Sequence, residues 1–391
     1  MQRNDAFRTA LAGLIAMAAA IGIGRFVYTP IVPAMIEELH LSTSAAGLIA
    51  SANFLGYLAG GLLAASPSLP GSRHAWLLGS LAASGLTTAG MGFVHGMQPF
   101  LLLRFVGGGS SAIVLVLASA IVLEHLAQAR RPGLSALHFA GVGCGIAASA
   151  VLVAALQAGG QSWAWLWEAS GILSLGAAAV VAVLLPQSTT AVGQTTGRTS
   201  RPAEPALLRL VAAYGLFGFG YVITATFLVV IVRTTPSIRA LEPVIWVVFG
   251  LAAAPSVAMW AWIATRFGTV ATFALACVVE ACGVLASIAW PSEMGAFASA
   301  ILVGGTFMGL TALGLVRART LAAGDPRRVL ALMTSAFGLG QIIGPSFAGM
   351  LSDRVGSFAM PSMAAVVALL IAAGLVCVSP ETAADSRAVP R

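Results

Sequence analysis

Apolar stretches long enough to cross a lipid bilayer recur from one end of this 391-residue chain to the other. A crossing helix needs about 20 predominantly apolar residues. Twelve such stretches are found, at 8–36, 42–65, 75–95, 99–124, 133–158, 164–186, 207–233, 242–263, 269–290, 295–317, 329–352 and 359–379. Because the backbone must satisfy its own hydrogen bonds inside lipid, only helices and closed barrels can cross it. The lengths predict an all-α polytopic membrane protein with twelve transmembrane helices.

Composition excludes the other broad classes. The chain is 59% apolar and 8% charged, whereas a soluble domain is about 25% charged. All 20 basic residues are arginines, and they are scattered through short connectors. A nucleic-acid surface would need them clustered on one solvated face, so no nucleic-acid partner is expected.

The chain divides into two halves around a polar segment. We expect an N-terminal six-helix bundle at 1–186, a cytoplasmic linker at 187–206, a C-terminal six-helix bundle at 207–379 and a cytoplasmic tail at 380–391. Glycine pairs recur between the halves at offsets of 196 and 197, as in Gly22/Gly24 against Gly218/Gly220, Gly107/Gly108 against Gly304/Gly305, and Gly141/Gly143 against Gly338/Gly340. A duplicated six-helix unit keeps its orientation, which predicts two parallel repeats.

Arginine counting sets the orientation, since cytoplasmic loops carry the excess of basic residues. With the N-terminus inside, fifteen arginines fall in inner loops and tails. The outer loops hold three, Arg233, Arg239 and Arg354. Both termini are therefore expected in the cytoplasm.

No enzyme or cofactor constellation is present in the sequence. Phosphate-loop and HExxH patterns are absent, and the five histidines are never at the spacing of metal ligands. The GVGCG segment around Cys144 resembles a dinucleotide turn, but it lies in an apolar helix with no strand before it. We expect no catalytic residues, no metal and no cofactor.

Charged residues inside spans are costly and are functional candidates by default. Arg25 lies near the middle of the first span, and Tyr28 follows three residues later, on the same face of a regular helix. The two are predicted to present a guanidinium and a hydroxyl to one ligand. The alternative is that Arg25 bonds a carbonyl freed by Pro30 or Pro33.

The other substrate-binding candidates are polar groups in further spans. Arg104 lies in the fourth span, and its alternative is a structural role in which the side chain reaches the lipid headgroups. Asn53 and Tyr57 lie four residues apart in the second span and form one polar stripe along it. The second half offers neutral groups only: Tyr221, which takes the place of Arg25 in the repeat, Thr224 and Gln341.

Two further groups are candidates for proton coupling. His138 carries the side chain whose charge changes near neutral pH. Glu280 is the acid placed at the middle of a span. The alternative for both is a buried packing role.

The segments GIGRFVYTPIVPAM (22–35) and FAGVGCGI (139–146), with Arg104 and the glycines that follow it, resemble the YbfB/YjiJ-type bacterial branch of the major facilitator superfamily. The resemblance implies two six-helix bundles around a central cavity lined by spans one, four, seven and ten. It also implies a multi-pass protein of the bacterial inner membrane. The antiporter-type motif in the fifth span keeps its glycines without the proline, so antiport is not strongly implied.

The sequence thus predicts a secondary active transporter that works by alternating access. Because the mid-depth charge is more cationic than anionic, the expected substrate is a small organic anion or an amphipathic carboxylated compound. The expected partners are this substrate, protons and membrane lipids, and the expected state is a monomer. The alternatives are efflux of neutral or lipophilic toxicants, and a transport-dead membrane sensor of the same fold.

Overall fold

The computed structural model describes residues 2–66, 71–185, 205–322 and 326–378, and every regular element in these ranges is a helix. The first half contains α1 (Gln2–Met17), η1 (Ala18–Ile23), α2 (Tyr28–Leu39), α3 (Thr43–Ala65), α4 (Arg73–Gly90), η2 (Met91–Phe93), α5 (Met97–Gln128), η3 (Pro132–Leu134), α6 (Ser135–Ala158) and α7 (Trp163–Leu184). The second half contains α8 (Pro205–Thr234), η4 (Pro236–Leu241), α9 (Glu242–Ala253), α10 (Ser256–Phe267), α11 (Thr269–Ala289), α12 (Glu293–Thr320), α13 (Pro326–Val355) and α14 (Ala359–Cys377).

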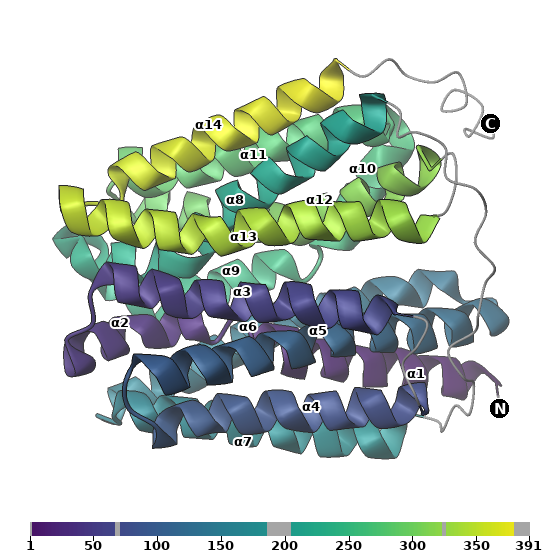
Figure 1. Ribbon diagram of the computed structural model, residues 1–391, viewed down its shortest axis with the longest axis horizontal. Helices are drawn as coiled ribbons and strands as arrows, with labels where there is room; N and C mark the ends of the chain where they lie inside the picture. Colours follow the sequence, from purple (N-terminus) through teal and green to yellow (C-terminus); the bar gives the residue numbers. More distant parts are fainter. Residues whose placement is uncertain (1, 67–70, 186–204, 323–325, 379–391) are drawn as a thin grey trace.

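Every predicted span overlaps a helix, which confirms the all-α polytopic architecture. Eleven described stretches are long and apolar enough to cross a membrane. The less apolar α4 is not among them, but it packs along α5 and α7 (Figure 1). Helix α8 begins at Pro205, two residues before the predicted start of its bundle. The rest of the predicted linker 187–206 and the predicted tail 380–391 lie outside the described residues.

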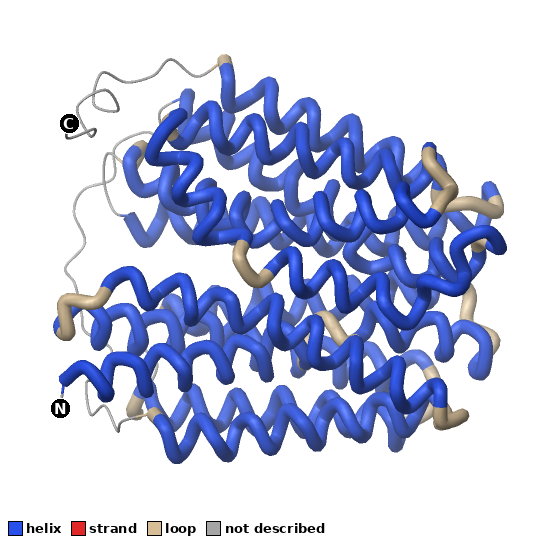
Figure 2. The backbone as a smooth tube through the Cα atoms, turned by 180° about the vertical axis from the view of Figure 1, so that it is seen from behind, coloured by secondary structure: helices blue, strands red, loops and turns tan. Residues whose placement is uncertain are grey.

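The helices of the two halves occupy separate parts of the molecule. Figure 1 shows α1–α7, coloured from purple through blue to teal, below α8–α14, coloured from teal through green to yellow, and Figure 2 shows the same arrangement from behind. The halves meet through α3 against α13, α6 against α9, and α2 against α8. Helix α1 begins and α14 ends at the same end of the molecule.

The first crossing is not the regular helix that the sequence predicts. After α1 the chain forms the π-helical turn η1, in which the Gly24 N–H donates to the Ala19 carbonyl, five residues back, at 2.9 Å. Residues 24–27 form a turn before α2 begins. A π-helical turn inserts an extra residue and rotates the side chains that follow it. Arg25 lies in the turn and Tyr28 begins α2, so the two are not neighbours on one regular helix.

The eighth crossing is also interrupted, between α9 and α10. Pro255 lies at the break. Proline has no backbone N–H, and its ring clashes with the carbonyl four residues earlier. The predicted span 242–263 is therefore two helices rather than one.

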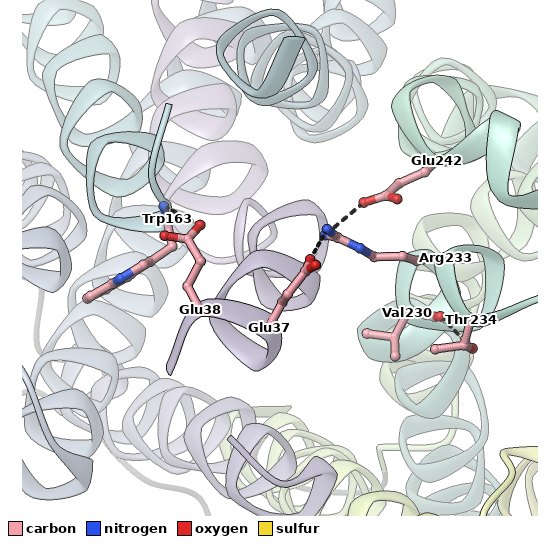
Figure 3. Close-up of polar contacts among 7 residues, drawn as sticks. All are labelled: Glu37, Glu38, Trp163, Val230, Arg233, Thr234 and Glu242. Atoms are coloured by element: carbon pink, nitrogen blue, oxygen red, sulfur yellow. Dashed lines mark hydrogen bonds and ion pairs between the residues drawn. The ribbon is translucent and has the colours of Figure 1, made fainter. Parts of the chain in front are cut away.

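The halves are clamped together at the end where α2, α8 and α13 finish and α3 begins, which we call the clamped end. Arg233 on α8 pairs there with Glu37 on α2, and with Glu242 on α9 at 3.2 Å (Figure 3). The Asp353 carboxylate on α13 accepts the Thr43 N–H at 3.0 Å and the Ser44 N–H at 2.8 Å. These are first-turn N–H groups of α3, which have no partner within their own helix.

Further hydrogen bonds join the halves between the clamped end and mid-depth. The Thr29 hydroxyl donates to the Ala225 carbonyl at 2.7 Å. The Ser51 hydroxyl donates to the Ile342 carbonyl at 2.6 Å and accepts from the Ser346 hydroxyl at 2.8 Å. The structure is thus a state in which the two halves are closed at the clamped end.

Removing the Asp353 carboxylate (Asp353→Ala) is expected to loosen the clamped end. Loss of a side-chain acceptor at a helix N-terminus costs about 0.5–2 kcal/mol, which corresponds to roughly a 2- to 30-fold larger open population. The measurement is the alkylation rate of a cysteine introduced at Ser346 by a membrane-impermeant maleimide. Asp5→Ala, at an exposed position on α1, is the matched control. An unchanged alkylation rate in Asp353→Ala would contradict the clamp.

Candidate functional site

Arg25 lies in the turn that follows η1, with its side chain enclosed by aromatic rings. The residue is 5% exposed. Its guanidinium carbon lies 4.0 Å from the centre of the Tyr57 ring, 4.7 Å from that of Phe54 and 5.3 Å from that of Phe26. A cation over the face of an aromatic ring is attracted by the ring's quadrupole. These three rings therefore stabilise the buried charge.

The edge of the same guanidinium has no partner. Nε and Nη2 of Arg25 are buried and make no hydrogen bond with any described residue. These two nitrogens form one side of the planar group, the side that can bind both oxygens of a carboxylate. A buried donor without a partner costs about 1–3 kcal/mol, so this edge has hydrogen-bonding capacity for a ligand or a water.

Arg104, on α5, uses its charge to hold the break in the first crossing. Its Nη1 donates to the Gly24 carbonyl and its Nη2 to the Arg25 carbonyl, both at 3.1 Å. Its guanidinium carbon lies 5.0 Å from the ring centre of Tyr28 and 5.5 Å from that of Trp167. Arg104 therefore positions the backbone of Arg25.

Tyr28 and Asn53 also form hydrogen bonds with backbone groups. The Tyr28 hydroxyl donates to the Ala46 carbonyl at 2.7 Å. The Asn53 amide donates to the Arg104 carbonyl at 2.9 Å, while its Oδ1 has no partner among the described residues. The structure thus places Arg25 with Tyr57 and places Tyr28 with Arg104, instead of joining Arg25 and Tyr28 at one ligand.

The second half faces Arg25 with an ordered aromatic stack. Tyr221 on α8 lies between Phe307 on α12 and Phe337 on α13, with ring centres 5.6 and 5.8 Å away and ring planes within 12° and 6° of its own. Phe307 also meets Phe26 of the first half edge-on at 5.7 Å. The Phe26 ring centre in turn lies 5.3 Å from the Arg25 guanidinium carbon. Arg25, Tyr57 and Tyr221 are therefore gathered where the halves meet.

Gln341 and Thr224, the remaining candidates of the second half, are fully buried. The Gln341 amide donates to the Tyr221 hydroxyl, and its Oε1 has no partner among the described residues. The Thr224 hydroxyl on α8 likewise lacks a partner among those residues. Both keep polar capacity for a ligand or a water.

The two proton-coupling candidates lie in different surroundings. Glu280 on α11 is fully buried beside Thr306, and neither carboxyl oxygen has a hydrogen-bond partner of normal geometry among the described residues. Thr306 directly precedes Phe307, whose ring stacks on that of Tyr221. His138 on α6 is fully buried, with Nε2 at 3.0 Å from the Ser119 hydroxyl. Glu280 is thus connected to the stack, whereas His138 packs within the first half.

Sequence reasoning missed the aromatic part of this arrangement. Phe26, Phe54, Phe307 and Phe337 carry no polar atom, and single aromatic residues in apolar helices give no signal that separates a binding wall from a packed core. It also missed the clamped end, because one sequence holds no information on which distant loops meet. Among the described residues, no group of three or more potential metal ligands is found.

Comparisons with known proteins identify the type of protein. A family model described as "Uncharacterised MFS-type transporter YbfB" matches residues 17–377. No curated protein matches the chain.

Solved structures of transporters share the fold. The nucleoside transporter NupG is similar with a TM-score of 0.70 at 14% identity, over 95% of this chain and 97% of that one. A bacterial homologue of the human lysosomal transporter Spinster, in an inward-facing and occupied conformation, is similar with a TM-score of 0.72 at 15% identity, over 94% and 95%. Since the family match spans most of the sequence, the chain belongs to the YbfB-type family of transporters in the major facilitator superfamily.

Proposed function

We propose that the protein is a secondary active transporter of a small organic anion or amphipathic carboxylated compound in the bacterial inner membrane. One observation supports an anionic substrate: the buried Nε–Nη2 edge of Arg25 has no hydrogen-bond partner among the described residues. A planar pair of donors with a fixed positive charge matches a carboxylate. The aromatic rings around it suit the apolar part of such a compound.

The location of Arg25 supports transport by alternating access. The groups that face each other come from both halves, Tyr57 and Arg25 from one and Tyr221 from the other. We propose that helices α1–α7 and α8–α14 are the two units that rock about this site. A substrate held between the units is released when they separate at either end.

Uptake by liposomes that contain only the purified protein tests this function. The probes are octanoate and benzoate, each with its amide, and uptake into protein-free liposomes is subtracted. The expected result is protein-dependent uptake of a carboxylate and not of the amides. Equal uptake of amides would replace the proposal with efflux of lipophilic compounds. No uptake of any probe would favour a transport-dead sensor of the same fold.

Orientation follows from the arginine distribution, and we propose that the clamped end is the outer end. Reporters fused after Arg198 and after Pro380 are expected to report a cytoplasmic location, because the loops on that side hold fifteen arginines against three. The measurement is the activity of a reporter pair, one active only in the cytoplasm and one only outside it. An external signal at either fusion would contradict the twelve-span topology.

Proton coupling is proposed for Glu280 first and His138 second. Neutralising the group that carries the proton (Glu280→Gln, His138→Asn) is expected to abolish uphill accumulation while counterflow exchange continues, because exchange needs no net proton movement. The measurement compares the two activities in the same liposomes, with an imposed pH gradient for accumulation. Equal loss of both activities in folded protein would assign a packing role to that residue.

A further inference from the structure

We propose that Glu280 is a neutral acid in the state that the structure shows, and that Thr306 is the positioning residue whose hydroxyl holds its proton. The inference rests on the proton coupling proposed above and deepens it, because it names the hydrogen bond that holds the coupling proton. It is carried by the burial of Glu280 and by the hydrogen bonds that Thr306 already makes within its own helix.

Glu280 lies in surroundings that disfavour a charged carboxylate. Its side chain is fully buried in the middle of α11. Among the described residues it forms no ion pair, and neither carboxyl oxygen has a hydrogen-bond partner of normal geometry. An ionised carboxylate without a partner is costly in an apolar interior. The neutral acid avoids this cost and gains an O–H group that can donate one hydrogen bond.

The helices around Glu280 bring no opposite charge to it. Helix α11 packs against α8, α10, α12 and α14. The charged residues of these four helices lie near the helix ends: Arg209, Arg233, Arg266, Glu293, Arg317 and Arg319. The titratable side chains nearer to Glu280 are those of Tyr221 on α8 and Cys277 on α11, and a phenol and a thiol are ordinarily neutral at pH 7. None of these helices therefore places a positive charge beside the carboxyl group.

Thr306 on α12 offers Glu280 an acceptor and not a donor. Its hydroxyl lies beside the carboxyl group. The single hydrogen of this hydroxyl is directed to its own helix, to the Leu302 carbonyl at 2.6 Å and the Val303 carbonyl at 3.1 Å. Only the acceptor capacity of the oxygen remains. A carboxylate has no hydrogen to donate to it, whereas the neutral acid has one, so the contact selects the protonated form of Glu280.

Loss of the proton changes this contact. The carboxylate that remains carries one negative charge and faces the lone pairs of the Thr306 oxygen. The contact becomes favourable again when the hydroxyl turns its hydrogen from the Leu302 carbonyl to the carboxylate. Threonine in a helix divides between two side-chain rotamers because its hydroxyl can bond these carbonyls in one of them. Thr306 thus has one arrangement for each protonation state.

The next residue on α12 connects Thr306 to the interface between the halves. Phe307 meets Phe26 of the first half edge-on, with ring centres 5.7 Å apart. Phe26 follows Arg25 in the chain, and its ring centre lies 5.3 Å from the Arg25 guanidinium carbon. A rearrangement at Thr306 is therefore one residue away from the contact that joins the halves beside the proposed anion site.

Infrared spectra of the purified protein test the protonation state without any substrate. The protein is studied at neutral pH in alkyl maltoside micelles, which contain no carbonyl group that would overlap the signal. The parent is expected to show the carbonyl band of a neutral carboxylic acid, and Glu280→Gln is expected to lack it. The band is expected to move in Thr306→Val, where the acid loses its acceptor, and to keep its position in Thr306→Ser. Thr311→Val is the matched control, because Thr311 donates to the Phe307 carbonyl of the same helix at 2.8 Å and lies on a different face of α12.

Uphill uptake of benzoate and octanoate into liposomes tests the coupling role of Thr306. One neutral hydrogen bond corresponds to about a 2- to 13-fold change in an equilibrium constant. The proton concentration that half-saturates uphill uptake is therefore expected to rise by this factor in Thr306→Val. It is expected to be unchanged in Thr306→Ser and Thr311→Val. Counterflow exchange is expected to continue in all three variants.

The outcomes separate this inference from the proposed function. A parent spectrum without a band that Glu280→Gln removes would overturn the neutral acid. An unmoved band or an unchanged half-saturating proton concentration in Thr306→Val, at a melting temperature equal to that of the parent, would overturn the role of Thr306. A parent that shows the band but accumulates neither probe would overturn the proposed transport of carboxylates and leave the neutral acid standing.

Discussion

The Arg25→Lys variant is expected to bind the carboxylate about 10- to 150-fold more weakly than the parent, although its formal charge is unchanged. The lysine ammonium is a compact point charge that lacks the planar pair of donors formed by Nε and Nη2. Losing one charge-assisted hydrogen bond costs about 1.5–3 kcal/mol, which gives this range. The measurement is a titration of benzoate or octanoate into purified protein.

Two controls make this result specific. Arg319→Lys, at an exposed position near the end of α12, carries the same chemical change away from the site and is expected to bind like the parent. Melting temperatures of both variants must match the parent, so that loss of binding reports the site alone. Normal binding by Arg25→Lys would remove the basis for an anionic substrate.

The Gly108→Ala variant is expected to lose about 1–3 kcal/mol in its free energy of unfolding and to bind the substrate more weakly. A Cβ at Gly108 would lie 1.9 Å from the Asn53 carbonyl oxygen and 3.0 Å from the Tyr57 nitrogen. These are backbone atoms of α3 that no side-chain rotation moves, so α3 and α5 must separate. Overpacking of this kind costs about 1–3 kcal/mol, and the separation also displaces Tyr57 from Arg25.

Gly79→Ala is the opposite case and serves as the control. Gly79 lies within α4, is exposed, and a Cβ there would meet nothing within 4 Å. Alanine in a helix interior is favoured over glycine by about 0.5–1 kcal/mol, so this variant is expected to be as stable as the parent or slightly more stable. Reversible unfolding in mixed micelles measures both variants. A Gly108→Ala protein as stable as Gly79→Ala would contradict the close packing of α3 on α5.

The helical spans were predictable because lipid imposes the same requirement on every crossing. Each predicted stretch overlaps a helix of the structure, and the arginine asymmetry does not depend on any side-chain contact. The interruption at residues 24–27 was not predictable, since apolar composition is the same in an α-helical and a π-helical turn. The break at Pro255 was likewise not predicted, because the apolar length of the span does not show it. The proline at that position was a signal from which the break could have been predicted.

The site was only partly predictable from residue type. A charge inside a span singles out both Arg25 and Arg104, because a charged residue is costly in an apolar span. What separates them is the turn after η1, which offers the carbonyls of residues 24 and 25 to Arg104 and leaves the edge of Arg25 free. That turn is held by hydrogen bonds from a different helix, α5, which the sequence alone does not reveal. The contact of Phe307 with Phe26 depends in the same way on the docking of the two halves.

The pairing of Glu37 with Arg233 shows a further limit of the sequence. The two residues lie 196 positions apart, and each reads alone as an ordinary charged residue at the end of a span. Only the docking of α2 against α8 brings them together. The clamped end, and with it the closed state of the structure, follows from that docking.

The proposed function requires that the Nε–Nη2 edge of Arg25 binds a carboxylate between the two halves. Its most direct measurement is the affinity of benzoate and octanoate, each against its own amide, for the parent and for Arg25→Gln at matched melting temperature. The parent is expected to bind at least one acid tenfold or more tightly than its amide, and Arg25→Gln is expected to bind that acid and its amide alike. An Arg25→Gln protein that still prefers the acid as strongly as the parent does would contradict it.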